Sequence, residues 1–172
     1  DYLRILRYFR FRIRFSRVAP DSEQLNAIKS NLEGLNQISG ERVWQELKKT
    51  FNYLPCSSLV ELMLDVKLFN FIGFSCKESS SYEEYSRKVI EELRTVETNV
   101  KNYCDQHLAP KLRASEVDQN LKRTKDLLPV IIISTCIQTD EMCSNAHKRL
   151  KFSNLERDTI LYIVANRNKD PP

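Results

Sequence analysis

The sequence has 172 residues, of which 41% are hydrophobic and 29% are charged; this composition excludes a disordered chain and allows one domain or two small helical subdomains. It contains only three glycines, and because strand-rich folds need more glycines in their turns, an all-α fold is predicted. The net charge of +4 is unevenly placed, since residues 1–19 hold six arginines and one aspartate. The basic character of the chain is therefore concentrated in its first twenty residues.

The cysteines and histidines give no pattern of a metal site or a catalytic nucleophile. No Cys-x-x-Cys pair occurs, and neither histidine has partners at ligand spacing. Reduced, buried thiols in a reducing compartment are therefore expected. The cysteines in question are Cys56, Cys76, Cys104, Cys136 and Cys143. The longest apolar stretch, residues 127–137, is too short to span a membrane and predicts a buried core segment.

The first predicted element is a helix that ends before Pro20. Its apolar residues recur at helical spacing, and its arginines recur at every third position from Arg4 to Arg10. Residues 11–15 alternate as a strand would, but continuation of the helix is favoured because no partner strand is evident. Asp21 or Ser22 is then predicted to cap a second helix, which breaks at Gly34.

The middle of the chain predicts three further helices. Ser39 is placed to cap the first of them by accepting from its first-turn amides, and Val43, Trp44, Leu47 and Phe51 form its buried stripe. A strongly apolar helix over residues 59–71 follows, then a loop over 77–81 and a long charged helix over 82–104.

The last third predicts a connector, two helices and a further element between them. Residues 111–125 are polar with charges of both signs, which is typical of a mobile connector. A core helix follows over residues 127–137, and Thr139-Asp140 begins the next element. Ser153 caps the last helix, with Glu156 at the position of a capping box.

Asp1, Arg4, Arg7 and Arg10 form the most chemically suggestive pattern. Steps of three residues turn each side chain back by about 60°, so the four lie in a slow spiral along one side of a helix. A guanidinium is a planar fork suited to a base edge or a phosphate, and the neighbouring carboxylate adds an acceptor. Such a set suits the recognition of a nucleobase without a template. The alternative is a solvated basic face with an incidental aspartate.

Three segments resemble the class II CCA-adding tRNA nucleotidyltransferases and their poly(A) polymerase relatives. DYLRILRYFRF resembles the end of a Glu-Asp-x-x-Arg motif that is followed by arginines at three-residue steps. ISGERVWQELKK resembles a later Ser-x-Glu-Arg motif, at a separation of the family's size. LKFSNLERDTILYIVANR is similar to a segment of eukaryotic members. The resemblance implies a neck-like helical domain over 1–75 and part of a helical body over 76–172.

The resemblance also implies roles for individual residues. Asp1 and Arg4 would pair with the incoming base, first of CTP and then of ATP, while Arg7 and Arg10 would be nucleotide contacts. The second motif, Ser39, Glu41, Arg42 and Glu46, is expected to be structural, with Glu41 and Arg42 bracing the base-reading helix. Arg12, Arg14 and Arg17 would contact tRNA phosphates or simply be exposed.

The family's catalytic head, with two magnesium ions on an Asp-x-Asp pair, has no counterpart here. The first residue is Asp rather than Met, so we expect a piece of a longer protein that is inactive alone. Expected partners are tRNA, CTP and ATP, with Mg²⁺ bound in the head and no membrane. Localisation would be mitochondrial, nuclear or cytosolic. The alternatives are a non-catalytic helical RNA-binding module and a poly(A) polymerase of the same family; a helical protein-interaction scaffold ranks last because it leaves the arginine spiral unexplained.

Overall fold

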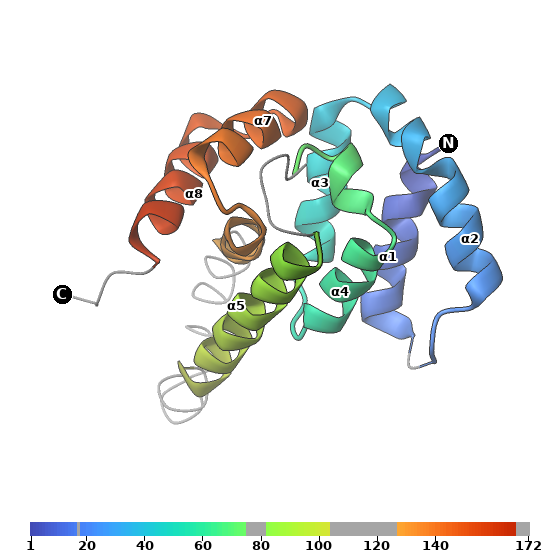
Figure 1. Cartoon of the computed structure of the whole chain (residues 1–172), viewed down its shortest axis with the longest axis horizontal. Coiled ribbons are helices and arrows are strands. Elements are labelled where there is room, and N and C mark those ends of the chain that lie inside the picture. The colour runs from blue at the N-terminus through green and yellow to red at the C-terminus, as the bar shows by residue number, and fades with distance from the viewer. Residues whose placement is uncertain (17, 75–81, 104–126, 168–172) are drawn as a thin grey trace, which may run out of the picture.

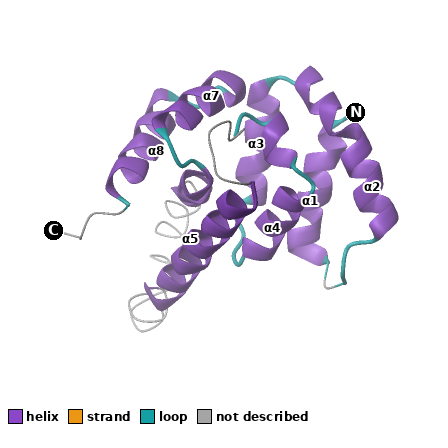
Figure 2. Ribbon diagram, viewed as in Figure 1, coloured by secondary structure: helices purple, strands orange, loops and turns teal. Residues whose placement is uncertain are grey.

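The computed structural model describes residues 1–16, 18–74, 82–103 and 127–167, and within these ranges the chain folds into helices without a strand. Figure 1 shows the helices as an irregular array, and Figure 2 shows that short loops join them. The predicted all-α class is confirmed. The predicted loop over 77–81 and the predicted connector over 111–125 lie outside the described residues.

Helix α1 (Leu3–Phe15) is continuous through the alternating residues, so the helical interpretation of residues 11–15 is confirmed. Its buried side includes Leu6 and Phe9, which are 1% and 0% exposed. The helix packs against α3 (Gly40–Thr50) and α4 (Ser57–Asp65). Burial of an aromatic ring and its aliphatic neighbours fixes the direction in which the other face of α1 points.

Helix α2 (Ser22–Asn31) begins as predicted, because the Asp21 carboxylate accepts a hydrogen bond of 3.0 Å from the amide of Glu23. The break expected at Gly34 is instead a tightening into a 3-10 helix, η1 (Leu32–Gln37). Gly34 is needed there for space, since a Cβ atom would lie 2.1 Å from the ring of Tyr2. The glycine thus lets η1 approach the start of α1.

Two local expectations for the middle of the chain are wrong. Ser39 precedes α3 as its N-cap residue, but its side chain makes no capping hydrogen bond. The helix predicted over 59–71 is divided into α4 and a 3-10 turn, η2 (Leu68–Phe71), because Lys67 adopts a left-handed conformation with a φ of 60°. The predicted apolar stripe of α3 is confirmed, with Val43, Trp44, Leu47 and Phe51 all buried.

The second half contains α5 (Tyr82–Tyr103), a helix over residues 127–136, α7 (Asp140–Leu150) and α8 (Asn154–Asn166). Thr139 caps α7 by accepting from the amide of Met142, and the predicted capping box of α8 is present. In that box the Ser153 hydroxyl accepts from the amide of Glu156, whose carboxylate accepts from the amide of Ser153.

A single arginine joins three of these elements. Arg167 lies 2.6 Å from the Glu92 carboxylate of α5 and donates to the backbone carbonyls of Ser134 and Ile137, at the end of the 127–136 helix. Its side chain is mostly buried, so the ion pair is poorly screened by water. These contacts satisfy carbonyls that a helix end leaves without partners.

The described cysteines, Cys56, Cys136 and Cys143, are free and buried. Burial raises the pKa of Cys136 to about 12 and raises the pKa of the other two thiols as well. At neutral pH they are therefore protonated and unreactive, as expected for core thiols. Among the described residues no helix is long and apolar enough to cross a membrane.

Candidate nucleotide-reading helix

Helix α1 presents one face to the core and another to solvent. Ile5 and Phe9 are buried against the rest of the array, whereas Arg4, Phe11 and Phe15 are exposed. Because α1 is packed on both α3 and α4 (Figure 1), its outer face is held in a defined orientation. The packed helix therefore holds the side chains of its outer face in fixed positions, where a ligand can reach them.

Asp1 and Arg4 lie at the exposed start of this helix. One oxygen of the Asp1 carboxylate accepts a hydrogen bond of 3.1 Å from the amide of Leu3, and the Asp1 carbonyl accepts one from the amide of Arg4. Among the residues that the structure describes, neither Arg4 nor Arg7 forms an ion pair. The two guanidiniums are therefore available to meet a base edge or a phosphate, and the Asp1 carboxylate is anchored at the start of the same helix.

Arg10 differs from the two arginines before it, because it already has a partner. Its Nε atom lies 3.1 Å from Oε2 of Glu46 on α3, and the other Glu46 oxygen lies 3.1 Å from Nζ of Lys49. Glu46 is only 5% exposed. The side chain of Arg10 thus ties α1 to α3, and its expected contact with a nucleotide stays a prediction.

The brace between α1 and the second motif comes from Glu46. Glu41 and Arg42 lie one turn earlier on α3 and are both exposed. The bracing role expected of that pair stays a prediction, and Glu46 is the residue of the motif that contacts α1 through an ion pair. The sequence placed Glu46 in the motif but gave no sign of its partner, because Arg10 is 36 positions away in the chain.

The later arginines of the basic segment do not behave alike. The Arg12 guanidinium donates hydrogen bonds of 2.5 Å to the carbonyl of Val18 and 3.4 Å to the hydroxyl of Ser16, so it closes the turn after α1. Arg14 is exposed, and its guanidinium carbon lies 5.0 Å from the ring centre of Phe15 and 5.2 Å from that of Tyr53. Arg17 lies outside the described residues.

Glu156 anchors α3, the helix beneath α1. Its carboxylate accepts a hydrogen bond of 3.1 Å from the indole of Trp44 and lies 3.2 Å from the ammonium of Lys48. Burial opposes the charged form, but hydrogen bonds from Ser153 and Trp44, together with Lys48, outweigh it and lower the pKa of Glu156. The charged carboxylate therefore stabilises the contact between α3 and α8.

The described residues do not fit a magnesium site. They hold no group of three or more His, Cys, Asp or Glu side chains that could bind a metal ion. Of the adjacent carboxylates Glu91 and Glu92, the second is engaged with Arg167. Among the described residues, therefore, no set of carboxylates is placed to hold the metal ions of phosphoryl transfer.

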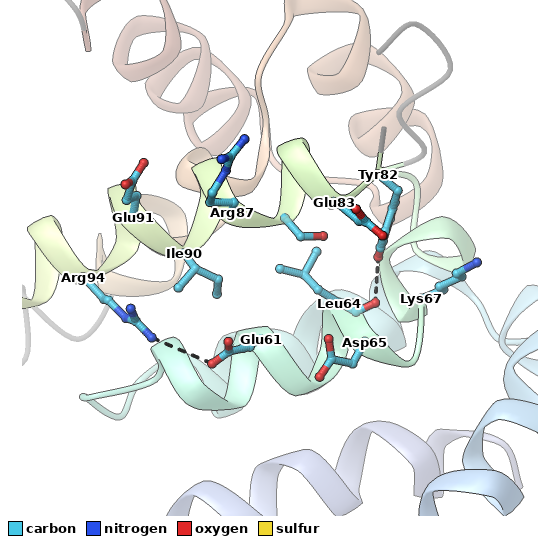
Figure 3. Close-up of a pocket in the computed structure, with 11 residues that line it drawn as sticks. Glu61, Leu64, Asp65, Lys67, Tyr82, Glu83, Arg87, Ile90, Glu91 and Arg94 are labelled. Atoms are coloured by element: carbon cyan, nitrogen blue, oxygen red, sulfur yellow. Dashed lines mark hydrogen bonds and ion pairs between the residues drawn. The ribbon is translucent and has the colours of Figure 1, made fainter. Parts of the chain in front are cut away.

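A hollow of about 520 Å³ lies elsewhere, between α4 and α5 (Figure 3). Its floor includes Leu64 and Ile90, and its rim carries four carboxylates and three cationic groups. Across the groove, Arg94 lies 3.9 Å from Glu61, and the Tyr82 hydroxyl donates to the Leu64 carbonyl. A rim with charges of both signs does not suit a polyanion.

Comparison with known proteins finds relatives along nearly the whole chain. A family model described as "Probable RNA and SrmB- binding site of polymerase A" matches residues 18–73, which run from the turn after α1 through η2. The curated protein named "CCA tRNA nucleotidyltransferase 1, mitochondrial" matches over 97% of this chain in several animals. The zebrafish (Danio rerio) protein is 46% identical, the human protein 32% and the mouse protein 31%.

The chain spans 32% of the length of these curated relatives. The matched region contains α1 with its arginine spiral, the second motif on α3 and the capped helix α8. These are the three segments that carry the resemblance in the sequence. These matches support the interpretation of the chain as a segment of a CCA-adding tRNA nucleotidyltransferase.

Proposed function

We propose that this chain supplies the base-recognition helix and part of the tRNA-binding body of an enzyme that adds CCA to tRNA 3′ ends. CTP and ATP would be the substrates, and the protein itself would take the place of a nucleic-acid template. The observation that carries the proposal is the outer face of α1. There Arg4 and Arg7 follow Asp1 along a packed helix and form no ion pair with any described residue.

The chemistry of base selection follows from these groups. An arginine presents two parallel N–H donors, and a carboxylate presents acceptors, so a neighbouring pair can complement the edge of a pyrimidine and of a purine. Arg7, three residues further along α1, would meet the phosphates. Arg10 and Glu46 would contribute by holding α1 on α3, so that the reading groups do not move when the base changes.

The transfer step itself needs carboxylates that the described residues do not provide. We therefore propose that two magnesium ions are bound by another part of the enzyme and that the 172 residues alone transfer no nucleotide. The metal ions would polarise the phosphoryl group and activate the attacking hydroxyl. The role of this chain would be to select the nucleotide and hold the RNA. We also propose a mitochondrial location, because the curated relatives are named as mitochondrial proteins.

A poly(A) polymerase is the second candidate, because the matching family model is described as a region of polymerase A. The two activities differ in product. A full-length protein containing this sequence should be supplied with tRNA that lacks its CCA end. We expect two C residues and one A when CTP and ATP are both present, with termination after the A. A long run of A residues from ATP alone would instead support the poly(A) assignment.

A further inference from the structure

The outer face of α1 carries exposed aromatic rings beyond the arginines that the proposed function uses. Phe11 is 49% exposed and Phe15 is 69% exposed. Their ring centres lie 6.2 Å apart, and the ring planes differ by 28°, so the two rings are stacked along the helix. Both rings therefore expose apolar surface to water that the fold does not bury.

These rings lie in line with Arg4. Seven residues are nearly two helical turns, so Phe11 falls on the same face as Arg4, about 10 Å further along the axis, and Phe15 follows one turn later. Successive nucleotides of a strand are separated by a few ångströms. An RNA end whose last nucleotide lies near Arg4 would therefore pass over the two rings within a few nucleotides.

A hollow of about 470 Å³ opens beside the rings, between the end of α1 and α2. Phe11, Phe15 and Tyr8 form its apolar walls, while Gln24 and Ser16 add polar groups at its edge. This volume is in the range of small-ligand sites, and apolar walls with a few polar groups are typical of such sites.

The charge around the rings indicates what kind of ligand fits. The guanidinium carbon of Arg10 lies 4.8 Å from the centre of the Phe11 ring, and Arg14 lies over both Phe15 and Tyr53. Aromatic rings interleaved with arginines are the arrangement that binds single-stranded nucleic acid, in which bases stack and phosphates meet cations. The mixed-charge groove between α4 and α5 lacks this combination.

We propose that Phe11 and Phe15 form a stacking platform for unpaired bases at the 3′ end of the RNA. The inference rests on the proposed function and adds to it a contact with the RNA strand itself. Arg14, which lies over the rings of Phe15 and Tyr53, would pair with the phosphate that follows a stacked base. The platform would hold the growing end in line with Arg4 without selecting its sequence, because every base has a face that can stack.

The test uses the 172-residue chain and a fluorescent ten-nucleotide single-stranded RNA, with affinity measured by anisotropy. Replacing both rings (Phe11→Leu and Phe15→Leu) should weaken binding on the order of tenfold. The tyrosine versions, Phe11→Tyr and Phe15→Tyr, should bind nearly as well as the parent. Leu155→Ala is the matched control, because Leu155 is apolar and 77% exposed but belongs to α8, which lies apart from α1 (Figure 1).

An RNA of the same length with abasic central positions separates stacking from charge. Removing the bases should weaken binding to the parent and leave binding to the double leucine variant unchanged, since the two changes remove the same interaction. The proposal is overturned if the leucine variant binds like the parent, or if base removal weakens both proteins equally. If the parent binds neither this RNA nor tRNA, the RNA-binding part of the proposed function fails as well.

Discussion

The outer face of α1 and the groove between α4 and α5 show two ways in which charged residues can be arranged on one small helical protein. The groove is the more hollow of the two, but its carboxylates and cations are mixed, and some face each other across it. On α1, by contrast, Arg4 and Arg7 form no ion pair among the described residues. The candidate site on α1 is therefore distinguished by arginines that have no acidic partner on a rigid helix, and not by the size of a hollow.

The outer face of α1 can present its arginines in a fixed orientation only if α1 is held rigidly by its buried side. Phe9→Ala should lower the free energy of unfolding by about 3–5 kcal/mol, because the ring is fully buried and its removal leaves a cavity. Urea denaturation gives the value. Phe11→Ala is the matched control on the outer face and should change stability by no more than about 0.5 kcal/mol. Similar decreases in the free energy of unfolding for Phe9→Ala and Phe11→Ala would contradict the division of α1 into a buried and an exposed face.

The brace between α1 and α3 should have a smaller effect. Glu46→Gln removes the charge that Arg10 and Lys49 share, and we expect a decrease of about 1–3 kcal/mol in the free energy of unfolding. Glu41→Gln, on an exposed position of the same helix, is the control and should be nearly neutral. An equal decrease in the free energy of unfolding for Glu41→Gln would indicate that the start of α3, and not Glu46 alone, braces α1.

The two charged regions should differ in RNA binding. Replacing Arg7 and Arg14 with Gln should reduce the slope of log affinity against log salt concentration by about one for each arginine–phosphate pair that the substitutions remove. The same change at Arg87 and Arg94, which line the groove, should leave slope and affinity unaltered. Filter binding of tRNA at several salt concentrations measures affinity and slope for both double variants. A larger effect from the groove variant would indicate that RNA binds at the groove and not on α1.

The smallest expected effect concerns the anchor of α3. The pKa of Glu156 is lowered in the folded state, so its charge contributes stability above the unfolded pKa, and that contribution disappears as pH falls through the folded value. The parent should therefore lose stability on acidification more steeply than Glu156→Gln, by up to about 1 kcal/mol. Thermal unfolding between neutral and acid pH measures the difference. Parallel curves would show that the charge of Glu156 does not anchor α3.

Local signals in the sequence predicted much of the fold. The spacing of apolar residues predicted α1, α3 and α5, and Ser153 with Glu156 predicted the start of α8, because a capping box depends only on neighbours in the chain. The break at Lys67 was not predicted. A left-handed lysine has no sequence signature, and the apolar pattern continues across it.

The residues of the candidate site could be predicted from the sequence, but the side-chain contacts that they make could not. The three-residue steps indicated that Asp1, Arg4, Arg7 and Arg10 share one side of a helix. The partner of Arg10 is 36 positions away and that of Trp44 is 112 positions away, so only tertiary packing brings them together. The contact of Arg14 with Tyr53 likewise depends on tertiary packing, whereas Arg12 closes its turn with near neighbours in the chain, Ser16 and Val18.

Nucleotide selectivity tests the central claim most directly. In a full-length protein containing this sequence, Arg4→Ala should reduce discrimination of CTP and ATP against UTP and GTP by about tenfold or more. Arg94→Ala, in the groove, is the control and should keep the selectivity of the parent. Incorporation of each nucleotide into tRNA lacking its CCA end gives the ratios. Unchanged selectivity in the Arg4 variant, with the protein folded and active, would contradict base recognition by α1.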